Sequence, residues 1–156
     1  MLSSESLAKI DLEIGNYPAE HKEAAVMATL RIVQEEQGWL SGETIRDIAT
    51  YLEIPPIRAY EVATFYSMYE LEETGRHRIE VCTNISCMLR GSDGVVSHIE
   101  ERLGIKVGET TADGRYTLRE VECLGACVGA PMMQVGNGYY EKLTTESIDA
   151  ILDGLE

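Results

Sequence analysis

Four cysteines, arranged as two pairs, are the residues of this chain best suited to chemistry. Cys82 and Cys87 form a C-x4-C pair, Cys123 and Cys127 form a C-x3-C pair, and these are all of the cysteines in the 156 residues. The N-terminus lacks the basic and apolar regions of a secretion signal, so we expect a reducing compartment where structural disulfides are rare. Four thiols in that setting point to metal binding or redox chemistry.

The spacing of the cysteines separates three kinds of site. Zinc modules usually take each pair of ligands from a short C-x2-C turn, and thiol–disulfide exchange enzymes also favour C-x-x-C. Neither pair here has that spacing. A [2Fe–2S] centre needs two ligands at each iron, which two separated pairs supply. The cluster is the favoured interpretation, while a four-cysteine zinc site and disulfide chemistry stay open as alternatives.

Small residues surround the second pair. Gly125, Ala126, Gly129 and Ala130 let the main chain approach a bound group closely, and Pro131 stiffens the exit from the segment. Bridging sulfides of an iron–sulfur cluster accept hydrogen bonds from such backbone N–H groups. This context favours a cluster over zinc. His21, His77 and His98 are isolated from the cysteines in sequence, and we interpret them as surface or structural residues.

Composition excludes several classes of function. The formal net charge of −14 argues against binding to nucleic acid. No stretch reaches the roughly 20 apolar residues of a membrane span. We therefore expect a cytoplasmic protein, or one peripheral to a membrane without insertion into it. No glycine pattern of a dinucleotide fold is present, so NADH and flavin are not expected on this chain, and no residue is predicted to be catalytic.

The first half of the chain has helical periodicity. Val26, Leu30 and Val33 share one face, which predicts a helix from Pro18 to Gln37 that stops at Gly38. A short helix over residues 6–14, a second helix capped by Ser41 and a third opened by Pro56 and continuing through Met68 complete a helical domain at residues 1–74. The aromatic run Tyr60–Tyr69 is predicted to lie in its core, with a docking surface as the alternative.

The second half, residues 75–156, has a β-α-β-β-β-α pattern. Alternating segments predict strands that run into Cys82 and Cys123, and a strong hairpin signal lies at 136–138. Apolar spacing predicts a helix that ends at Gly104 and a last helix capped by Thr144 or Thr145. Each cysteine pair is predicted to lie in a loop that follows a strand, so that four thiols can converge at one edge of a small sheet. The fold class is therefore α+β.

Several segments resemble one family. The stretch DGRYTLREVECLGACVGAP at 113–131 resembles the signature of the E subunit of NADH-quinone oxidoreductase, respiratory complex I, and CTNISCMLRG at 82–91 resembles the first ligand pair of that family. In the helical half, GWL at 38–40, IPP at 54–56 and YEVATFY at 60–66 are similar to its N-terminal region. The resemblance extends from about Pro18 onward.

The resemblance implies a thioredoxin-like second domain that carries one [2Fe–2S] cluster. Cys82 and Cys87 would bind one iron, and Cys123 and Cys127 the other. The chain would be an electron-transfer subunit of an enzyme, peripheral on the cytoplasmic side of the inner membrane. Its cluster would accept single electrons from flavin mononucleotide in an adjacent subunit that also binds NADH, and the isolated chain would have no turnover.

Three rival functions stay open. The equivalent subunit of an NAD-linked hydrogenase or formate dehydrogenase shares the chemistry and differs only in assembly. A zinc-stabilised interaction module would use the same cysteines without a redox role and would be colourless. A thiol oxidoreductase would keep its disulfide-exchange activity without iron.

Overall fold

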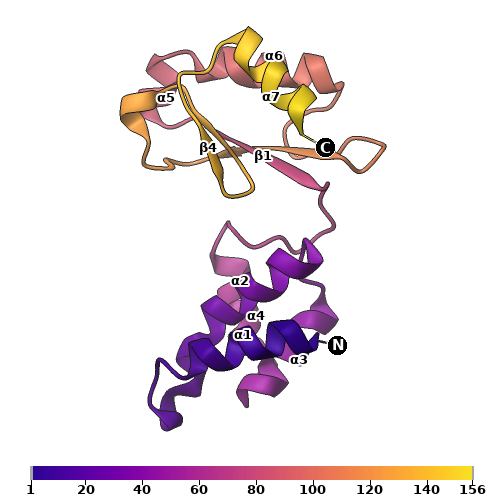
Figure 1. Cartoon of the computed structure of the whole chain (residues 1–156), viewed down its shortest axis with the longest axis vertical. Coiled ribbons are helices and arrows are strands. Elements are labelled where there is room, and N and C mark those ends of the chain that lie inside the picture. The colour runs from indigo at the N-terminus through magenta and orange to yellow at the C-terminus, as the bar shows by residue number, and fades with distance from the viewer. Residues whose placement is uncertain (1, 156) are drawn as a thin grey trace. The chain divides into compact units, whose positions relative to one another are not determined.

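The structure, a computed structural model, describes residues 2–155 (Figure 1). The chain divides into two compact units between Glu73 and Thr74, and each unit has its own hydrophobic core. Within residues 2–155, no helix combines the length and the apolar character that a membrane crossing requires. The α+β class predicted from the sequence is confirmed: the first unit is helical and the second contains a sheet with helices.

The first unit consists of helices whose ends follow from local sequence. Ser41 caps its helix by accepting a hydrogen bond from the N–H of Thr44 at 3.1 Å, and Pro56 occupies the first turn of the next helix. Gly38 ends a helix with φ of 84°, a left-handed conformation that favours glycine. The elements are α1 Ser4–Ile14, the 3-10 helix η1 Ala19–Ala25, α2 Val26–Gln37, α3 Gly42–Leu52 and α4 Pro56–Phe65.

Two predicted helices in this unit are corrected. The span from Pro18 to Gln37 is not one helix, because η1 precedes α2 and contains the non-helical residue His21. Its sequence, AEHKEAA, has no large apolar side chain to hold a continuous helix against the core. Helix α4 ends at Phe65, so Met68 lies outside it.

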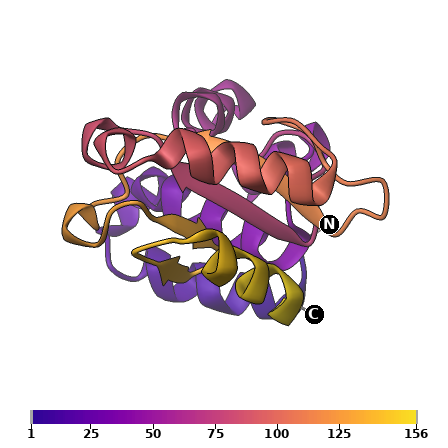
Figure 2. The same cartoon turned by 90° about the horizontal axis from the view of Figure 1, so that it is seen from above.

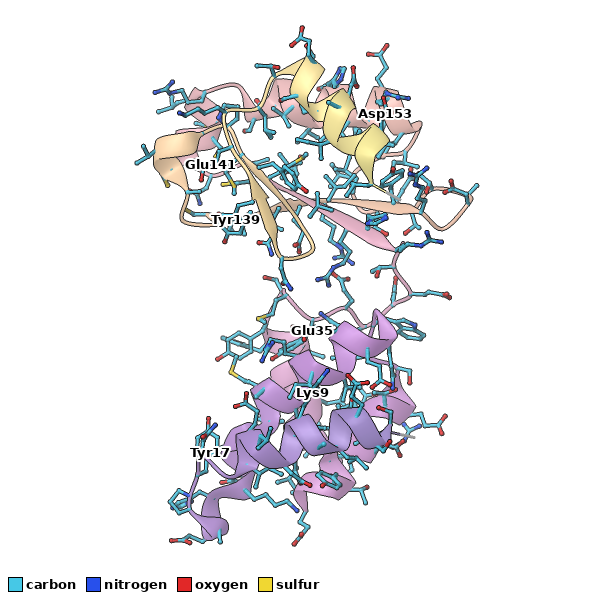
Figure 3. All side chains as sticks on the ribbon, in the orientation of Figure 1. Lys9, Tyr17, Glu35, Tyr139, Glu141 and Asp153 are labelled. Carbon is cyan, nitrogen blue, oxygen red and sulfur yellow. The ribbon has the colours of Figure 1, made fainter. Side chains whose placement is uncertain are left out.

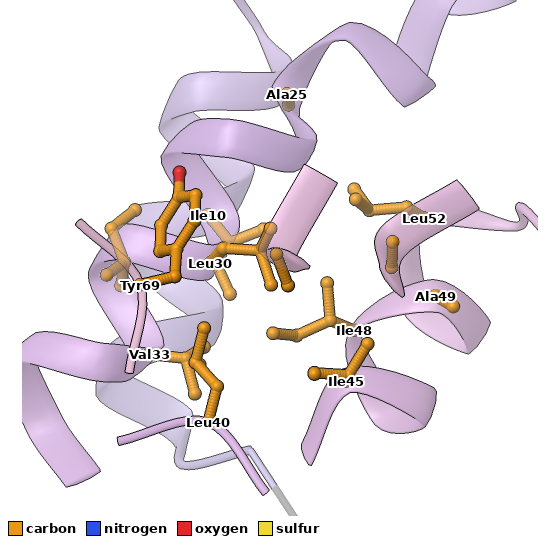
Figure 4. Close-up of a cluster of buried hydrophobic side chains, with 13 residues drawn as sticks. Ile10, Ala25, Leu30, Val33, Leu40, Ile45, Ile48, Ala49, Leu52 and Tyr69 are labelled. Carbon is orange, nitrogen blue, oxygen red and sulfur yellow. The ribbon is translucent and has the colours of Figure 1, made fainter. Parts of the chain in front are cut away.

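The core of the helical unit gathers aliphatic side chains from helices α1, α2, α3 and α4 and from η1 (Figure 4). Ile10, Leu30, Ile48 and Leu52 are almost completely buried there. Tyr69 joins them, and its hydroxyl donates to the carbonyl of Met27 at 2.9 Å.

The aromatic run is only partly core. Tyr69 is buried, but Phe65 is 78% exposed, and Tyr66 and Met68 are also exposed. The chain leaves helical geometry at Tyr66, which ends the regular alternation of buried and exposed faces. The prediction that the whole run is core was therefore wrong for Phe65, Tyr66 and Met68.

The second unit is a four-stranded sheet with the order β2-β1-β3-β4. Strands β1 and β2 are parallel, and the β1–β3 and β3–β4 pairs are antiparallel. The predicted hairpin joins β3 to β4. The elements are β1 His77–Cys82, α5 Ile85–Leu89, α6 Ser92–Leu103, β2 Tyr116–Val121, the 3-10 helix η2 Cys127–Gly129, β3 Met133–Val135, β4 Gly138–Tyr140 and α7 Thr145–Gly154.

The core of the sheet unit lies beneath α6 and α7, which cover the same side of the sheet (Figure 2). Ile79 in β1 is paired with Leu118 in β2 and Val135 in β3, and all three side chains are buried. Side chains alternate along a strand, so Cys82 lies on the face opposite to Ile79 and Val81. The cysteine is accordingly part of a different buried cluster.

Helix α7 begins with a capping box that can be tested. Thr144 accepts a hydrogen bond from the N–H of Ser147 at 3.2 Å, and the Ser147 hydroxyl accepts one from the N–H of Thr144 at 2.9 Å. Replacing Thr144 with alanine should destabilise the sheet unit by about 1 kcal/mol, measured by urea unfolding. The neighbouring Thr145→Ala change, which leaves the box intact, is the control. Equal effects of the two changes would contradict this role of Thr144.

Candidate metal centre

Both cysteine pairs lie at one edge of the sheet. Cys82 is the last residue of β1 and is in register with Val121, the last residue of β2, and Cys123 follows two positions later. Parallel neighbouring strands present the same ends at the same edge. The predicted placement of the pairs after two strands therefore brings them to one site.

The first pair is buried. Cys82 and Cys87 are each almost inaccessible to solvent. The N–H of Cys82 donates to the carbonyl of Met132 at 3.2 Å, which fixes the end of β1. The sequence predicted that Cys87 lies in a loop. The structure places it in the short helix α5 instead. Asn84 starts this helix by accepting from the N–H of Ile85 at 2.8 Å.

The second pair is exposed and close together. The sulfurs of Cys123 and Cys127 lie 3.5 Å apart. Two sulfurs on one tetrahedral metal, with bonds of about 2.3 Å, would be about 3.8 Å apart, so this pair is near the spacing that a shared metal requires. Between them Gly125 has φ of 86°, a left-handed turn that brings the two ends of the segment together. Cys127 begins η2.

Direct contacts join the segments that carry the two pairs. The Asn84 side-chain amide donates to the carboxylate of Glu122, the residue before Cys123. The N–H of Thr83 donates to the carbonyl of Val121 at 3.1 Å, extending the β1–β2 ladder by one step. These two contacts fix the backbone next to Cys82 relative to the backbone next to Cys123.

The segment between the exposed cysteines packs against the small hydrophobic cluster that contains the buried pair. Ala130 and Met132 pack with Cys82 and Cys87 in the buried part of this cluster, and Leu124 and Ala126 of the second segment pack against it. The chain between Cys123 and Cys127 therefore touches the residues that surround the first pair.

The pKa of the Cys87 thiol is raised. Burial is the largest cause, and the hydrogen bond with Cys82 raises it further, while the backbone N–H of Met132 lowers it. Negative charge on Cys82 or Cys127 also raises this pKa. Sulfur must be deprotonated to bind a metal, so loading this site requires a proton to leave Cys87.

The donor set suits a two-iron cluster. The four cysteines form two pairs on adjacent segments of the sheet edge. A [2Fe–2S] cluster takes two protein sulfurs at each of two irons, so the four cysteines fit that group as donors.

The histidines lie in other surroundings. His98 Nε2 is 2.9 Å from a carboxylate oxygen of Asp149, linking α6 to α7. The ring of His77 packs on the ring of Tyr116 at the start of β1.

Exposed apolar side chains border the cysteines. Ile85 and Leu89 on α5 are 66% and 75% exposed, and Val128, next to Cys127, is 98% exposed. The central part of a protein–protein interface is enriched in apolar side chains, so these residues are candidates for contact with a partner protein.

Sequence reasoning missed two parts of the site. Helix α5 had an available signal, because Asn84 is a favoured N-cap residue directly before the run ISCML. The contact from Tyr139 on β4 to the carbonyl of Leu124 had none, because it joins residues that are 15 positions apart.

A small sheet thus carries two cysteine pairs at one edge, a donor set that an iron–sulfur cluster could use. The chain belongs to the thioredoxin-like [2Fe-2S] ferredoxin family, whose model matches residues 10–156. The predicted family and cofactor class are therefore confirmed.

Within this family, the chain is similar to E subunits of NADH-quinone oxidoreductase. The E subunit of NADH-quinone oxidoreductase from Rickettsia bellii (strain RML369-C) is 48% identical over 143 residues, covering 91% of this chain and 86% of the relative. An E subunit of the same enzyme from Rhizobium meliloti (strain 1021) is 43% identical over 145 residues, covering 93% and 85%. The predicted resemblance to E subunits is thus confirmed.

A solved structure shares the fold of both units. The air-oxidized NAD+-reducing [NiFe]-hydrogenase superposes with a TM-score of 0.71 over 81% of this chain, at 21% identity. This chain spans 22% of the hydrogenase chain. At that identity the likeness establishes the fold alone.

Proposed function

We propose that the chain is the [2Fe–2S] electron-transfer subunit of an NADH-oxidising respiratory complex. Cys82 and Cys87 bind one iron, and Cys123 and Cys127 bind the other. The observation that carries this proposal is the meeting of two cysteine pairs at adjacent strand ends, with the exposed sulfurs 3.5 Å apart. The names of the relatives supply the type of complex.

The two pairs have different tasks in this proposal. When bound, the cluster supplies transfer of one electron at a time. Cys82 and Cys87 hold its inner side away from water, because both are buried beside Ala130 and Met132. Cys123 and Cys127 hold its outer side at the surface, where a partner protein can approach. The hydrogen bonds between the β1 and β2 ends hold the segments that carry these ligands in place.

The electron donor in this proposal is flavin mononucleotide in an adjacent subunit that also binds NADH. NADH delivers two electrons as a hydride, and a flavin can pass them on singly, which matches a one-electron carrier. The complex would hold the chain peripherally on the cytoplasmic side of the inner membrane. The same assignment would suit the diaphorase part of an NAD-linked hydrogenase or formate dehydrogenase, which co-purified subunits would distinguish.

Reduction by NADH tests this proposal. The purified chain alone should stay oxidised when NADH is added, because no nucleotide site is expected on it. The chain co-purified with its flavin subunit should show an electron paramagnetic resonance signal of a reduced [2Fe–2S] centre within one mixing time. A cluster that NADH reduces without a partner would contradict the proposal. So would a cluster that stays oxidised in the complex although its measured potential lies above that of NADH.

A further inference from the structure

Tyr139 reaches from the hairpin to the segment that carries the exposed cysteines. Its hydroxyl donates to the carbonyl of Leu124 at 2.9 Å, and Leu124 lies between Cys123 and Cys127. The side chain is half exposed, so this bond is not needed to satisfy a buried hydroxyl (Figure 3). The bond instead fixes one particular carbonyl beside the candidate ligands.

Fixing this carbonyl also fixes the next N–H group. The bond between Leu124 and Gly125 is a trans peptide, in which C=O and N–H point in opposite directions. The carbonyl of Leu124 points to Tyr139 on β4, so the N–H of Gly125 points away from β4. Gly125 has φ of 86° and no side chain, and this peptide could rotate readily without a partner.

A second attachment lies on the other side of Cys127. The N–H of Lys142, two residues after β4, donates to the carbonyl of Gly129 at 2.6 Å. A Cβ added to Gly129 would overlap the side chain of Glu141. Strand β4 and the residues after it therefore hold the segment of Cys123 and Cys127 on both sides of Cys127, and Tyr139 is the only side chain of this group with a hydrogen bond to Leu124 in the described chain.

We propose that Tyr139 is a positioning residue that raises the reduction potential of the cluster by holding the N–H of Gly125, a residue between the two exposed cysteines in sequence, in position to donate to a sulfur of the bound cluster. This inference rests on the proposed function. Hydrogen bonds to cluster and cysteine sulfurs set the potential of iron–sulfur centres. Reduction adds negative charge, and a donor is held more tightly by the more negative state. The N–H directed by Tyr139 therefore stabilises the reduced form.

The Tyr139→Phe variant of the full chain tests this inference. The ring is kept and only the hydroxyl is lost, so the variant should assemble the cluster fully. Its one-electron reduction should become less favourable by about two- to tenfold, as expected for one hydrogen bond. A tenfold change corresponds to about 59 mV toward more negative potential. The potential is read from a redox titration followed by electron paramagnetic resonance.

Tyr140→Phe is the matched control, because it makes the same change at the next residue of β4. Tyr140 packs against the core of the sheet unit and makes no hydrogen bond to the 123–127 segment in the described residues. Its potential should equal that of the wild type.

Three results would overturn the inference. The first is an unchanged reduction potential in Tyr139→Phe, and the second is an equal shift of the potential in both variants. The third is a Tyr139→Phe protein that cannot assemble the cluster, because a bond that only orients one peptide is dispensable for assembly. A wild-type chain that binds no cluster would instead defeat the proposed function itself. The two failures are therefore distinguishable.

Discussion

Replacing Cys127 with alanine is expected to abolish assembly of the iron–sulfur cluster. Under the proposed assignment, one iron would keep only Cys123 as a protein ligand. Loss of even an outer partner of a metal ligand costs about 10- to 100-fold in metal affinity, so loss of the ligand itself should exceed that. Iron and acid-labile sulfide per chain, measured on protein purified without oxygen, should fall at least about tenfold.

The fold should survive this change. Cys127 is exposed, and surface substitutions usually alter stability by less than about 0.5 kcal/mol. Val128→Ala is the control, because Val128 is adjacent and 98% exposed but is not a proposed ligand. It should retain the full iron content. A Cys127→Ala protein with as much cluster as the control would show that Cys127 is not a ligand.

Replacing Ile79 with alanine is expected to destabilise the sheet unit strongly. Ile79 is 0% exposed in β1, an interior strand of the sheet that leads to Cys82. Truncation of a buried isoleucine leaves a cavity and costs about 2–5 kcal/mol. Because a domain is stable by only about 5–15 kcal/mol, the urea midpoint should fall markedly. The far-ultraviolet circular dichroism of the variant follows this unfolding.

Ile85→Ala is the matched control for this second prediction. Ile85 lies in the same unit but is 66% exposed, so the same truncation removes little buried surface. Its stability should stay within about 0.5 kcal/mol of the wild type. Similar losses from the two variants would mean that β1 does not carry the core of this unit.

The sequence predicted those elements whose signals are local. The alternation before Cys82 and Cys123 predicted both strands, and the caps at Ser41 and Thr144 lie where expected. The sequence predicted that the two cysteine pairs could converge at one edge of the sheet, but it did not predict which strands pair to bring them there. The parallel pairing of β1 with β2, which joins residues 39 positions apart from His77 to Tyr116, produces that convergence.

Other features depend on contacts that sequence periodicity does not contain. The exposure of Phe65 follows from where α4 ends, since an aromatic run alone does not tell core from surface. The burial of Cys87 follows from its position in α5, and the bond from Tyr139 to Leu124 depends on how the hairpin folds back. Cysteine spacing was sufficient to identify the candidate ligands. Which residues pack around those ligands could be seen only in the structure.

The visible absorption spectrum of the protein purified without oxygen, with iron and acid-labile sulfide measured on the same sample, tests the central claim most directly. The four-cysteine assignment predicts a red-brown protein with about two irons and two sulfides per chain, whose colour bleaches on reduction with dithionite. A colourless protein that contains about one zinc per chain would contradict the electron-transfer function and leave a structural zinc module in its place.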